Sequence, residues 1–313
     1  MTGAIHIPVL LEEVISYIKP KPNEDFIDAT LGGGGYTKAI LEKNSPHGRV
    51  MCFDLDKEAI AVVRSQLNKF FSRVIYINDN YSKLKTKIDE YQFNKICGIV
   101  CDLGYSSLQI KDRKRGFSFE SEGELDLRYN IETKLTADEI LNKWSENEII
   151  EILKNYGEEP LAKRIAREII FIRKKTKITS RILREIVERV YGRTWRKPSR
   201  IHPATRTWQA LRIAVNDELA HLKNFLPQAV SVLENGGKLA IVSFHSLEDK
   251  IVKEFFKLEA RDCVCPKEAT ICVCHHQASI KILTKKPITA SLREINHNPR
   301  SRSGKLRVIQ KII

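Results

Sequence analysis

The stretch DATLGGGGYT (28–37), followed by CFD (52–54), decides the fold of this chain. Residues 24–27 in front of it predict a short strand, residues 38–42 behind it predict a helix, and residues 49–54 predict a second strand that ends in a carboxylate. Glycine has no Cβ, so the backbone of such a turn can approach a ligand closely. The acid about 20 residues further on can accept hydrogen bonds from two ribose hydroxyls. With strands on both sides, the pattern favours a nucleoside pocket over a purely structural turn.

The glycine spacing selects among ligands of this kind. A dinucleotide fingerprint needs a third glycine where the helix packs on the strand, and the candidate positions hold Thr37 and Lys38. A phosphate-binding loop ends in Gly-Lys followed by Ser or Thr, and the run has no such ending. The sequence therefore predicts a pocket for an adenosine without phosphates. S-adenosylmethionine (AdoMet) is the commonest ligand of that kind.

The bulk composition excludes several classes of protein. The chain has 313 residues, of which 42% are apolar, so it can bury a substantial core in one large domain or two smaller ones. It has no run of 18 apolar residues and no basic start followed by an apolar segment, so we expect neither a membrane span nor a signal peptide. Seven cysteines, an odd number, favour reduced thiols, and we expect a cytoplasmic protein.

The charge of the chain is unevenly distributed. The net charge is +14, from 53 basic and 39 acidic residues. Between Pro160 and Arg212 there are 16 Lys or Arg and three acids, a net charge of +13. Such a concentration attracts polyanions, of which RNA and DNA are the usual ones, and the alternative is a solvated helical face.

Strands and helices alternate in the first hundred residues. After a helix at 9–18, strands are expected at 26–30, 50–54, 74–78 and 95–102. This rhythm is typical of a doubly wound, mostly parallel α/β sheet, which binds ligands at the carboxyl ends of its strands. From about 107 to 208 only loops and helices are expected. Helices follow at 209–222 and near 227–233, and the sheet resumes at 236–244 and closes at 305–313.

Polar residues follow the fourth expected strand, in the loop Asp102-Leu-Gly-Tyr-Ser-Ser107. In a doubly wound enzyme this loop faces the reacting end of the ligand. An exocyclic amine is a poor nucleophile because its lone pair is delocalised into the ring, and acceptors that bond its hydrogens favour the pyramidal transition state. Asp102, Ser106 and Ser107 are suitable acceptors. A structural polar turn is the alternative, and Asp102 can instead serve the cofactor.

The end of the third expected strand, Asn78-Asp79-Asn80-Tyr81, offers groups for an adenine. Its acid or amides suit the adenine amino group, and Tyr81 can stack on the ring, whereas an ordinary Asx turn is the alternative. His245 lies between a strand and a helix, where it contacts either substrate or nearby backbone.

Basic residues mixed with aromatics predict contacts with RNA at Arg113–Phe119 and Arg193–Lys197, and the loop Pro299–Arg307 is suited to clamping phosphates. The candidate RNA-binding residues are Arg113, Arg115, Arg196, Arg200, Arg206, Arg300, Arg302 and Arg307.

Four cysteines lie within twelve residues: Cys263, Cys265, Cys272 and Cys274. They can hold a structural zinc ion, although two thiolates converge less readily from Cys-x-Cys than from the usual Cys-x₂-Cys. The alternative is an insert of reduced cysteines, and no other metal is expected.

These motifs together resemble, nearly from end to end, the ribosomal small-subunit methyltransferase H family (RsmH, also called MraW). The matching motifs are HIPVLLEE (6–13), DATLG (28–32), DLGYSS (102–107), RGFSF (115–119), LDLR (125–128), GEE (157–159), WQALRI (208–213), SFHSLED (243–249) and NPRSRS (298–303).

The resemblance implies an AdoMet-dependent enzyme that methylates N4 of one cytidine, position 1402, in 16S rRNA of the small ribosomal subunit. It implies a Rossmann-like methyltransferase domain in two parts, 1–106 and 209–313, the second with the cysteine-rich insert near 263–276. The residues between them, 107–208, would form an inserted basic, helical domain that recognises the substrate. The family's cofactor positions fall on Gly34, Gly35, Tyr36, Asp54, Tyr81, Asp102 and Gln109.

The chain departs from the family pattern at a few positions. Tyr36 stands where the family usually has histidine, so a backbone contact would be kept while a side-chain contact would change. Tyr105 and Leu108 replace the usual valine and proline. The cysteine-rich insert occurs only in some members, which argues against a catalytic metal. The rival interpretations are methylation of another RNA or of a protein, and a non-catalytic RNA-binding protein with a structural AdoMet site.

Overall fold

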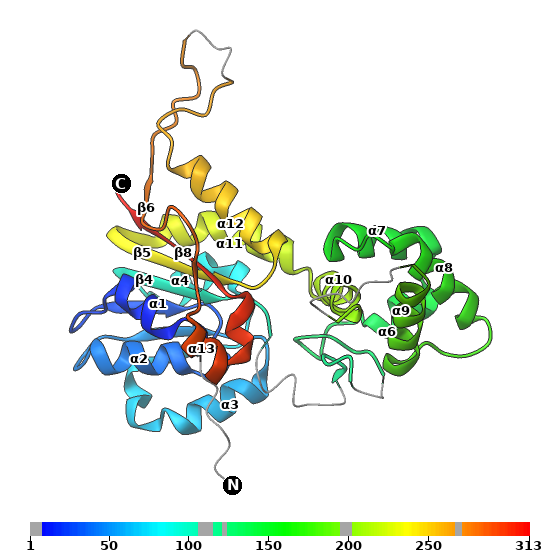
Figure 1. Ribbon diagram of the computed structural model, residues 1–313. Helices are drawn as coiled ribbons and strands as arrows, with labels where there is room; N and C mark the ends of the chain where they lie inside the picture. The colour runs from blue at the N-terminus through cyan, green and yellow to red at the C-terminus, as the bar shows by residue number, and fades with distance from the viewer. Residues whose placement is uncertain (1–7, 106–114, 121–123, 195–201, 267–270) are drawn as a thin grey trace. The chain divides into compact units, whose positions relative to one another are not determined.

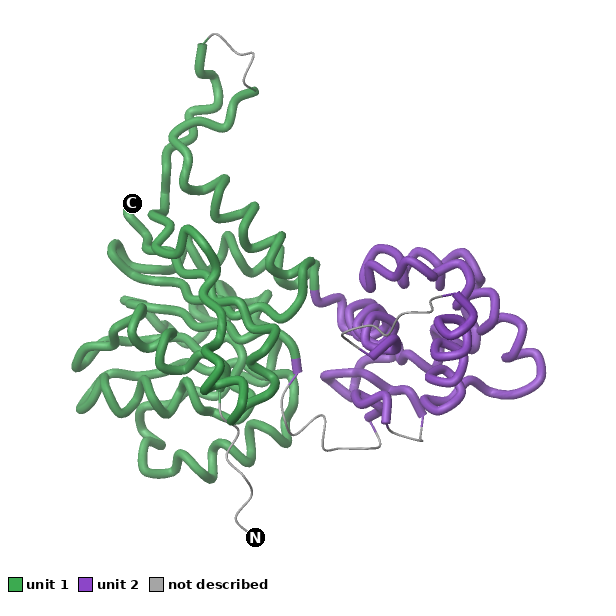
Figure 2. The backbone as a smooth tube through the Cα atoms, viewed as in Figure 1, with its two compact units in different colours: residues 1–104, 219–313 green, residues 105–218 purple. Residues whose placement is uncertain are grey.

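The computed structural model describes residues 8–105, 115–120, 124–194, 202–266 and 271–313. The chain folds into two compact units (Figure 2). Unit 1 comprises residues 1–104 and 219–313, and unit 2 comprises residues 105–218. Unit 1 is therefore built from both ends of the chain, and unit 2 is inserted after its fourth strand. Within the described ranges, no helix is long and apolar enough to cross a membrane.

A mostly parallel sheet forms the centre of unit 1. Its strands are β1 (Asp25–Asp28), β2 (Val50–Phe53), β3 (Val74–Ile77), β4 (Ile96–Asp102), β5 (Leu233–Ser243), β6 (Ile280–Ile282), β7 (Ile288–Thr289) and β8 (Lys305–Lys311). Their order is β3-β2-β1-β4-β5-β8-β6, with β7 also paired to β8. β1 to β5 pair in parallel, whereas β8 runs antiparallel to its neighbours. The strand order reverses between β1 and β4, which confirms the predicted doubly wound, Rossmann-like α/β fold.

Helices cover both faces of this sheet, because successive strand residues point to opposite faces. On one face lie α1 (Leu11–Ile18), α2 (Gly35–Lys43) and α3 (Lys57–Gln66), and on the other α4 (Leu84–Tyr91), α11 (Glu218–Val232) and α12 (Ser246–Glu259). Fully buried Phe26 of β1 packs with the first set, and its neighbour Ile27 packs with the second. Figure 1 shows the sheet between α11 and α12 above and α1 and α2 below. Shorter elements are η1 (Asn68–Arg73), η2 (Tyr81–Lys83), α13 (Leu292–His297) and η4 (Pro299–Ser303).

Unit 2 has a helical core of its own. Its helices are α6 (Ala137–Lys143), α7 (Glu146–Gly157), α8 (Ala162–Arg173), α9 (Ser180–Thr194) and α10 (Ala204–Asn216), and its described residues include no strand. Each helix contributes a side chain with at most 1% exposure to one apolar cluster: Ile140, Leu153, Ile169, Leu183 and Leu211. A capping box at Ser145, with Glu148 reaching back to it, begins α7.

Several element boundaries differ from the sequence prediction: α10 begins at Ala204 rather than 209, β5 begins at Leu233 rather than 236, and β6 and β7 were not predicted. The expected helix at 209–222 is divided, because Asp217 has a left-handed φ of 47° and ends α10. Pro227, expected near the start of a separate helix, lies inside α11. The apolar period continues through Asp217, so periodicity alone did not reveal the break. α10 packs against α7, where a Cβ on Gly157 would lie 2.7 Å from the carbonyl oxygen of Arg206. As a result, unit 2 extends to Glu218.

Candidate active site

The carboxyl ends of the parallel strands bring three acids to one edge of the unit 1 sheet. Asp28 ends β1, Asp54 follows β2, and Asp102 ends β4, the strand hydrogen-bonded to β1. The registers pair Asp28 with Cys52 and with Val100, so these three strands end side by side. In doubly wound folds this edge, at the reversal of strand order, is where ligands bind.

The glycine run makes the sharp turn from β1 into α2. Gly32 has a φ of 49° and Gly34 a φ of 74°, both in the left-handed region that favours glycine. The Gly34 N–H donates to the carbonyl of Leu31 at 2.7 Å, and a Cβ on Gly34 would lie 2.4 Å from Val63 Cγ1 of α3. A side chain at position 34 would thus collide with α3, and the N–H groups of the first turn of α2 lie at the same edge of the sheet as the three acids.

Asp54 is tied to this turn. Its Oδ2 accepts the Gly32 N–H at 2.9 Å and its Oδ1 accepts the Asp56 N–H at 2.9 Å. Burial raises the pKa of Asp54 to about 6, against these two hydrogen bonds, which lower it. Each carboxylate oxygen keeps a second lone pair, so the group can still accept two hydroxyl donors. Asn78 supports it by donating from Nδ2 to the Asp54 carbonyl at 3.0 Å.

Asp28 was not among the predicted site residues, and the structure gives it a supporting position. Its Oδ2 accepts the Thr37 hydroxyl at 2.7 Å, and its Oδ1 accepts the Thr30 N–H at 3.2 Å. Thr30 Oγ1 in turn accepts the Asp102 N–H at 2.6 Å, so this network connects β1, α2 and β4. Burial raises the pKa of Asp28 to about 6. Its place at the end of a strand directly before the glycine run was the available sequence signal.

Of the three acids at this edge, Asp102 has the carboxyl group with the fewest hydrogen-bond partners among the described residues. Its Oδ1 is buried and has no hydrogen-bond partner among the residues that the structure describes. Burial, and then the nearby charges of Asp28 and Glu248, hold its pKa well above the ordinary value. A buried, unpaired acceptor is costly in a folded protein, and such groups mark sites where a ligand supplies the partner.

The side chain of Tyr36 is buried and bonds to the backbone in front of α1. Its ring is 3% exposed and its hydroxyl donates to the carbonyl of Val9, in front of α1. Burial raises the pKa of its hydroxyl well above the usual range. The backbone of Tyr36, in the first turn of α2, remains at the glycine turn. Sequence alone did not reveal the Val9 contact, because Val9 is far from Tyr36 along the chain.

Tyr81 lies after β3, beside the same edge. Its ring meets the Phe225 ring edge-on, with centroids 5.1 Å apart, and it is half-buried. Asp79 pairs with Lys83 at 2.9 Å, and although burial alone would raise the pKa of Asp79, hydrogen bonds from Lys83 and the Asn80 N–H lower it. Asn80 caps η2 by accepting the Ser82 N–H at 2.8 Å. Both acidic and amide side chains of this loop are therefore engaged locally.

His245 is bonded to nearby groups at the end of β5. Its Nδ1 accepts the Glu248 N–H at 3.4 Å, and its Nε2 lies 3.1 Å from Glu248 Oε1. Glu248, 2% exposed, also accepts the Phe244 N–H at 2.8 Å. His245 thus caps α12 by bonding local backbone, and a contact between His245 and substrate stays a prediction.

Several predicted residues lie outside the described residues: Ser106, Ser107, Gln109, Arg113, Arg196 and Arg200. In unit 2, Arg115 donates from Nη2 to the carbonyl of Tyr129 at 2.8 Å, and Arg206 donates from Nη1 to the carbonyl of Glu158 at 3.2 Å. In unit 1, Arg302 of η4 is exposed and Arg300 is half-buried.

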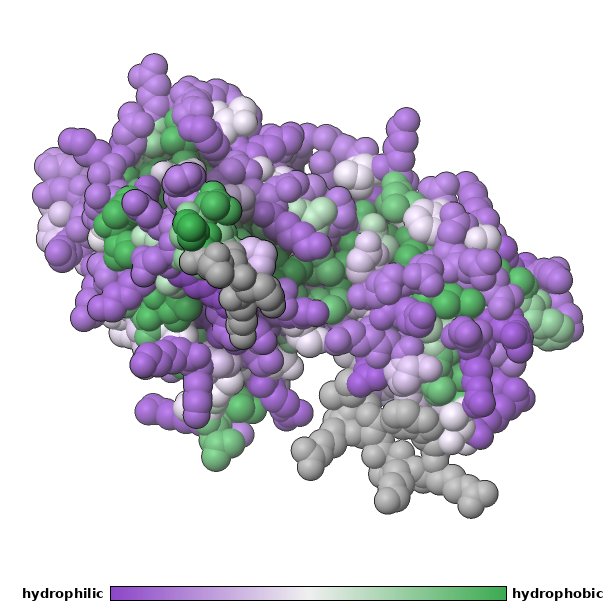
Figure 3. Space-filling view, turned by 90° about the horizontal axis from the view of Figure 1, so that it is seen from above, coloured by the Kyte–Doolittle hydropathy of each residue, from purple (hydrophilic) through white to green (hydrophobic). Residues whose placement is uncertain are grey.

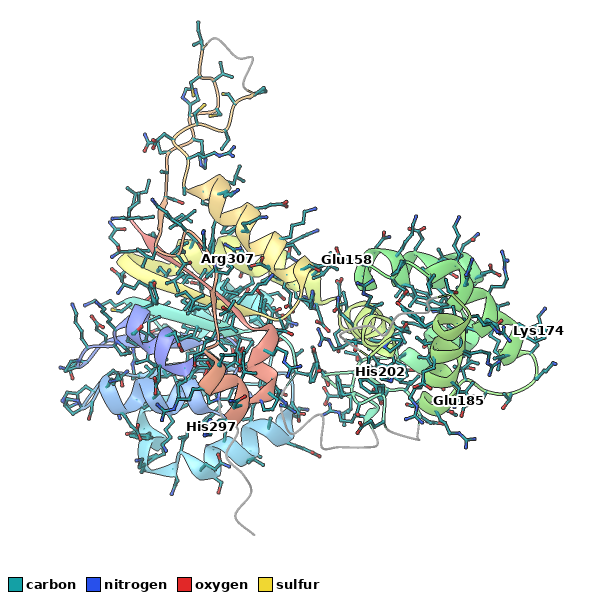
Figure 4. All side chains as sticks on the ribbon, viewed as in Figure 1. Glu158, Lys174, Glu185, His202, His297 and Arg307 are labelled. Carbon is teal, nitrogen blue, oxygen red and sulfur yellow. The ribbon has the colours of Figure 1, made fainter. Side chains whose placement is uncertain are left out.

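Arg307 is not placed as an exposed phosphate ligand. It is 8% exposed on β8 and donates from Nε and Nη2 to the two oxygens of Asp249, at 2.7 and 3.2 Å. Figure 4 labels Arg307 within the body of unit 1. Arg307 lies in both the expected loop 299–307 and the expected strand 305–313, and the structure has it in the strand, because β8 begins at Lys305.

A Rossmann-like fold with a glycine turn between β1 and α2, an acid after β2 and an acid at the end of β4 is typical of the class of AdoMet-dependent methyltransferases. A family model described as the MraW methylase family matches residues 3–312, and the chain belongs to this family. AdoMet is its methyl donor, and the glycine turn and Asp54 offer groups that fit AdoMet.

Curated relatives agree with this assignment. "Ribosomal RNA small subunit methyltransferase H" of Dehalococcoides mccartyi strain BAV1 is 46% identical over 98% of this chain and 87% of the relative. The protein of the same name from Heliobacterium mobile is 46% identical over 98% of this chain and 99% of the relative. A solved structure of a putative rRNA-methylase from Clostridium thermocellum covers 98% of this chain and 99% of that chain, with a TM-score of 0.47 and 16% identity, which is too distant to support an argument.

Proposed function

We propose that this chain transfers a methyl group from AdoMet to the N4 amino group of one cytidine of 16S rRNA, position 1402 in its family. The observation that carries the proposal is a family match over residues 3–312, together with Asp102 at the end of β4, whose buried Oδ1 has no partner among the described residues. Relatives named as small-subunit rRNA methyltransferases align with nearly the whole chain. We accordingly expect it to act in the cytoplasm, where small ribosomal subunits are assembled.

Residues at the carboxyl edge of the sheet are suited to hold the cofactor. Gly34, Gly35 and Tyr36 would contact it through backbone, because the glycine turn has no Cβ in its way. Asp54 would accept the ribose hydroxyls with the lone pairs that Gly32 and Asp56 leave open. Tyr81 would pack on the adenine, its ring already fixed by Phe225. Gln109, outside the described residues, keeps the cofactor role that the family resemblance implies.

AdoMet supplies an electrophilic methyl group when bound, and Asp102 acts on the amine that attacks it. Its free Oδ1 would accept a hydrogen bond from the N4 amino group, which keeps the nitrogen lone pair out of the ring. After transfer the methylated nitrogen must lose a proton, and a carboxyl group whose pKa is raised by burial is suited to hold it at Oδ1. Ser106 and Ser107 would supply further acceptors.

Basic residues of each unit would bind the substrate RNA. The exposed Arg302 of η4 and the exposed Lys and Arg side chains of α8 and α9 are suited to bind phosphates. The target cytosine would be turned out of its stack to reach the methyl group. Arg113, Arg115, Arg196, Arg200, Arg206 and Arg300 remain candidates for the same role.

The test uses small subunits from cells that lack the enzyme, incubated with the purified chain and labelled AdoMet. We expect label in one cytidine of 16S rRNA as N4-methylcytidine. The Asp102→Asn variant should lose about 10²-fold or more of the rate and still bind AdoMet, because it changes the acceptor and not the glycine turn. The matched control is Asp89→Asn on α4, an exposed acid paired with Lys85, which should keep full activity.

Three substrates in the same assay separate the rival functions: assembled subunits, naked 16S rRNA and ribosomal proteins. Label in protein, or in a base other than cytidine, would replace the proposed substrate. No label anywhere, with AdoMet bound, would leave an RNA-binding protein with a structural cofactor and would overturn the proposed catalysis.

A further inference from the structure

Residues 261–266 and 271–279 form the described parts of an arm that extends from unit 1 between α12 and β6 (Figure 1). Its described residues, 261–266 and 271–279, contain no helix or strand, and none of them is buried. The base of the arm is anchored, since the Ser279 N–H donates to the Glu259 carbonyl at 2.9 Å and the Ser279 hydroxyl to Glu259 Oε2 at 2.9 Å. Beyond that base, no apolar core accounts for a defined conformation. Ile271 and Val273, for example, are 75% and 72% exposed.

Four thiols converge in this arm. The Sγ atoms of Cys263 and Cys272 are 3.5 Å apart, those of Cys272 and Cys274 3.6 Å, and those of Cys263 and Cys274 3.7 Å. Cys265 completes the group, and all four Sγ atoms lie within 4.8 Å of one another. Four sulfurs around a zinc ion at about 2.3 Å are about 3.8 Å apart in a tetrahedron. The spacing is thus that of a tetrahedral site and is far longer than the about 2.05 Å bond of a disulfide. Thiolates converge less readily from Cys-x-Cys than from Cys-x₂-Cys, but the sulfur atoms of Cys272 and Cys274 do converge here.

The backbone around these thiols favours thiolates. The Val264 N–H donates to Cys274 Sγ and the Val273 N–H to Cys265 Sγ, both at 3.4 Å, so each Cys-Val-Cys segment donates to a sulfur of the other. Several thiolates this close repel one another, and a divalent cation removes that repulsion.

We propose that Cys263, Cys265, Cys272 and Cys274 bind one structural zinc ion that holds the arm in its conformation. Four thiolates without an open position make a closed site, which is the arrangement of structural zinc and leaves no place for a substrate. The ion would replace the apolar core that the arm lacks, as in small metal-stabilised modules. The four cysteines are far from Asp54 and Asp102 in sequence, and the zinc proposal does not depend on the proposed methyl transfer.

The first test measures metal in the full-length protein, purified without a metal-affinity step. We expect one zinc per chain by elemental analysis. Replacing zinc with cobalt(II) should give the visible ligand-field and near-ultraviolet charge-transfer absorption of a tetrahedral site with four sulfur ligands. These measurements use the unmodified chain, so they do not depend on the folding of a variant.

The second test compares two matched cysteine variants. Cys274→Ser should lose most of the zinc, and trypsin should then cleave after Arg261 about tenfold faster or more, as it should in the unmodified chain with a chelator. Cys97→Ser, at a half-buried cysteine of β4 outside the arm, should change neither. The proposal is overturned by a chain that binds no zinc after growth and reconstitution with it. The proposal is also overturned if the four cysteines bind iron instead of zinc. A thiol count lower by four would show that they form two disulfides, which overturns it as well.

Discussion

Gly34 is restricted both by its backbone and by its neighbour. Its φ of 74° is unfavourable for any other residue, and a Cβ would lie 2.4 Å from Val63 Cγ1. We expect Gly34→Ala to lower the free energy of unfolding by about 2–4 kcal/mol and to weaken AdoMet binding, because α3 must move. Thermal unfolding and calorimetric titration with AdoMet measure the two effects.

Shortening Val63 separates the two causes. In a Gly34→Ala, Val63→Ala double variant the steric part should be relieved, so the combined loss of stability should be smaller than the sum of the single losses. Strictly additive losses would mean that the backbone conformation alone sets the requirement for glycine.

Asp54 should make AdoMet binding depend on pH. Its pKa of about 6 means that it is ionised at pH 7.5 and mostly protonated at pH 5, where it no longer accepts two hydroxyl donors. The Kd for AdoMet should therefore rise about tenfold between pH 7.5 and pH 5, the loss expected one unit below the pKa. Asp54→Asn should weaken binding at pH 7.5 and remove most of this dependence. A pH dependence unchanged in the variant would assign it to another group.

The effect of the same acids on stability has the opposite sign. Asp28 and Asp54 both have pKa values raised to about 6 in the folded chain, so the folded state binds their protons more tightly than the unfolded state. Their contribution favours the folded state below about pH 4 and is lost as the pH rises through about 6. This stability is present where AdoMet binding is weakest, so loss of binding at pH 5 cannot be attributed to unfolding caused by these two groups.

At the scale of elements, the Tyr36 side chain of α2 bonds the backbone just in front of α1. The Tyr36 hydroxyl donates to the carbonyl of Val9, which is 2% exposed. Tyr36→Phe leaves that carbonyl unpaired and should lower the free energy of unfolding by about 1–2 kcal/mol, with the AdoMet Kd unchanged within about twofold. The control is Tyr17→Phe on α1, whose hydroxyl bonds none of the described residues. A loss of AdoMet binding without a loss of stability would show that the Tyr36 side chain contacts the cofactor.

β8 and α12 are joined by the pair Arg307–Asp249. Although burial alone would raise the pKa of Asp249, the hydrogen bond and charge of Arg307 lower it. Arg307→Ala leaves Asp249 with only Lys305, 3.6 Å away, and should cost about 3–5 kcal/mol of unfolding free energy. Arg302→Ala, at an exposed position, should leave stability within about 0.5 kcal/mol and weaken RNA binding. The assignment of Arg307 to the interior fails if its replacement weakens RNA binding while stability is kept.

The sequence predicted the elements of unit 1 well because each signal was local. Glycines at the turn, apolar runs for β1, β2 and β4, and acids after them are all contained in short segments, so the edge that carries Asp54 and Asp102 was predictable. The contact of Tyr36 with Val9 and that of Arg307 with Asp249 depend on which segments face each other in the folded chain. No spacing encodes those partners, and both residues were consequently first considered as ligand contacts.

At the scale of the whole molecule, acidic residues elsewhere in unit 2 offset part of the positive charge of segment 160–212. Residues 105–218 contain 24 Lys or Arg and 18 Asp or Glu, so unit 2 has a net charge of +6, although its segment 160–212 carries +13. Acids of other elements pair with that segment, as Glu146 does with Arg167 at 3.9 Å and Asp138 with Lys177 at 3.1 Å. Lys174, labelled in Figure 4, and Lys175 remain exposed. Hydrophilic side chains cover most of the face seen in Figure 3.

This distribution makes a specific prediction for RNA binding. With a few phosphate contacts rather than a continuous basic face, log K should fall with log salt at a slope of about −2 to −3, or about 0.7 per phosphate of single-stranded RNA. Binding of a 16S rRNA fragment should thus weaken by about 10- to 100-fold between 50 and 200 mM salt, measured by filter binding or anisotropy.

A Lys174→Ala, Lys175→Ala variant should reduce the slope by up to about 1.4 if both residues contact phosphates, whereas Lys87→Ala on α4 should not change it. A loss of less than threefold over the same range would contradict a phosphate-dominated interface. The rRNA would then be held mainly by contacts with its bases.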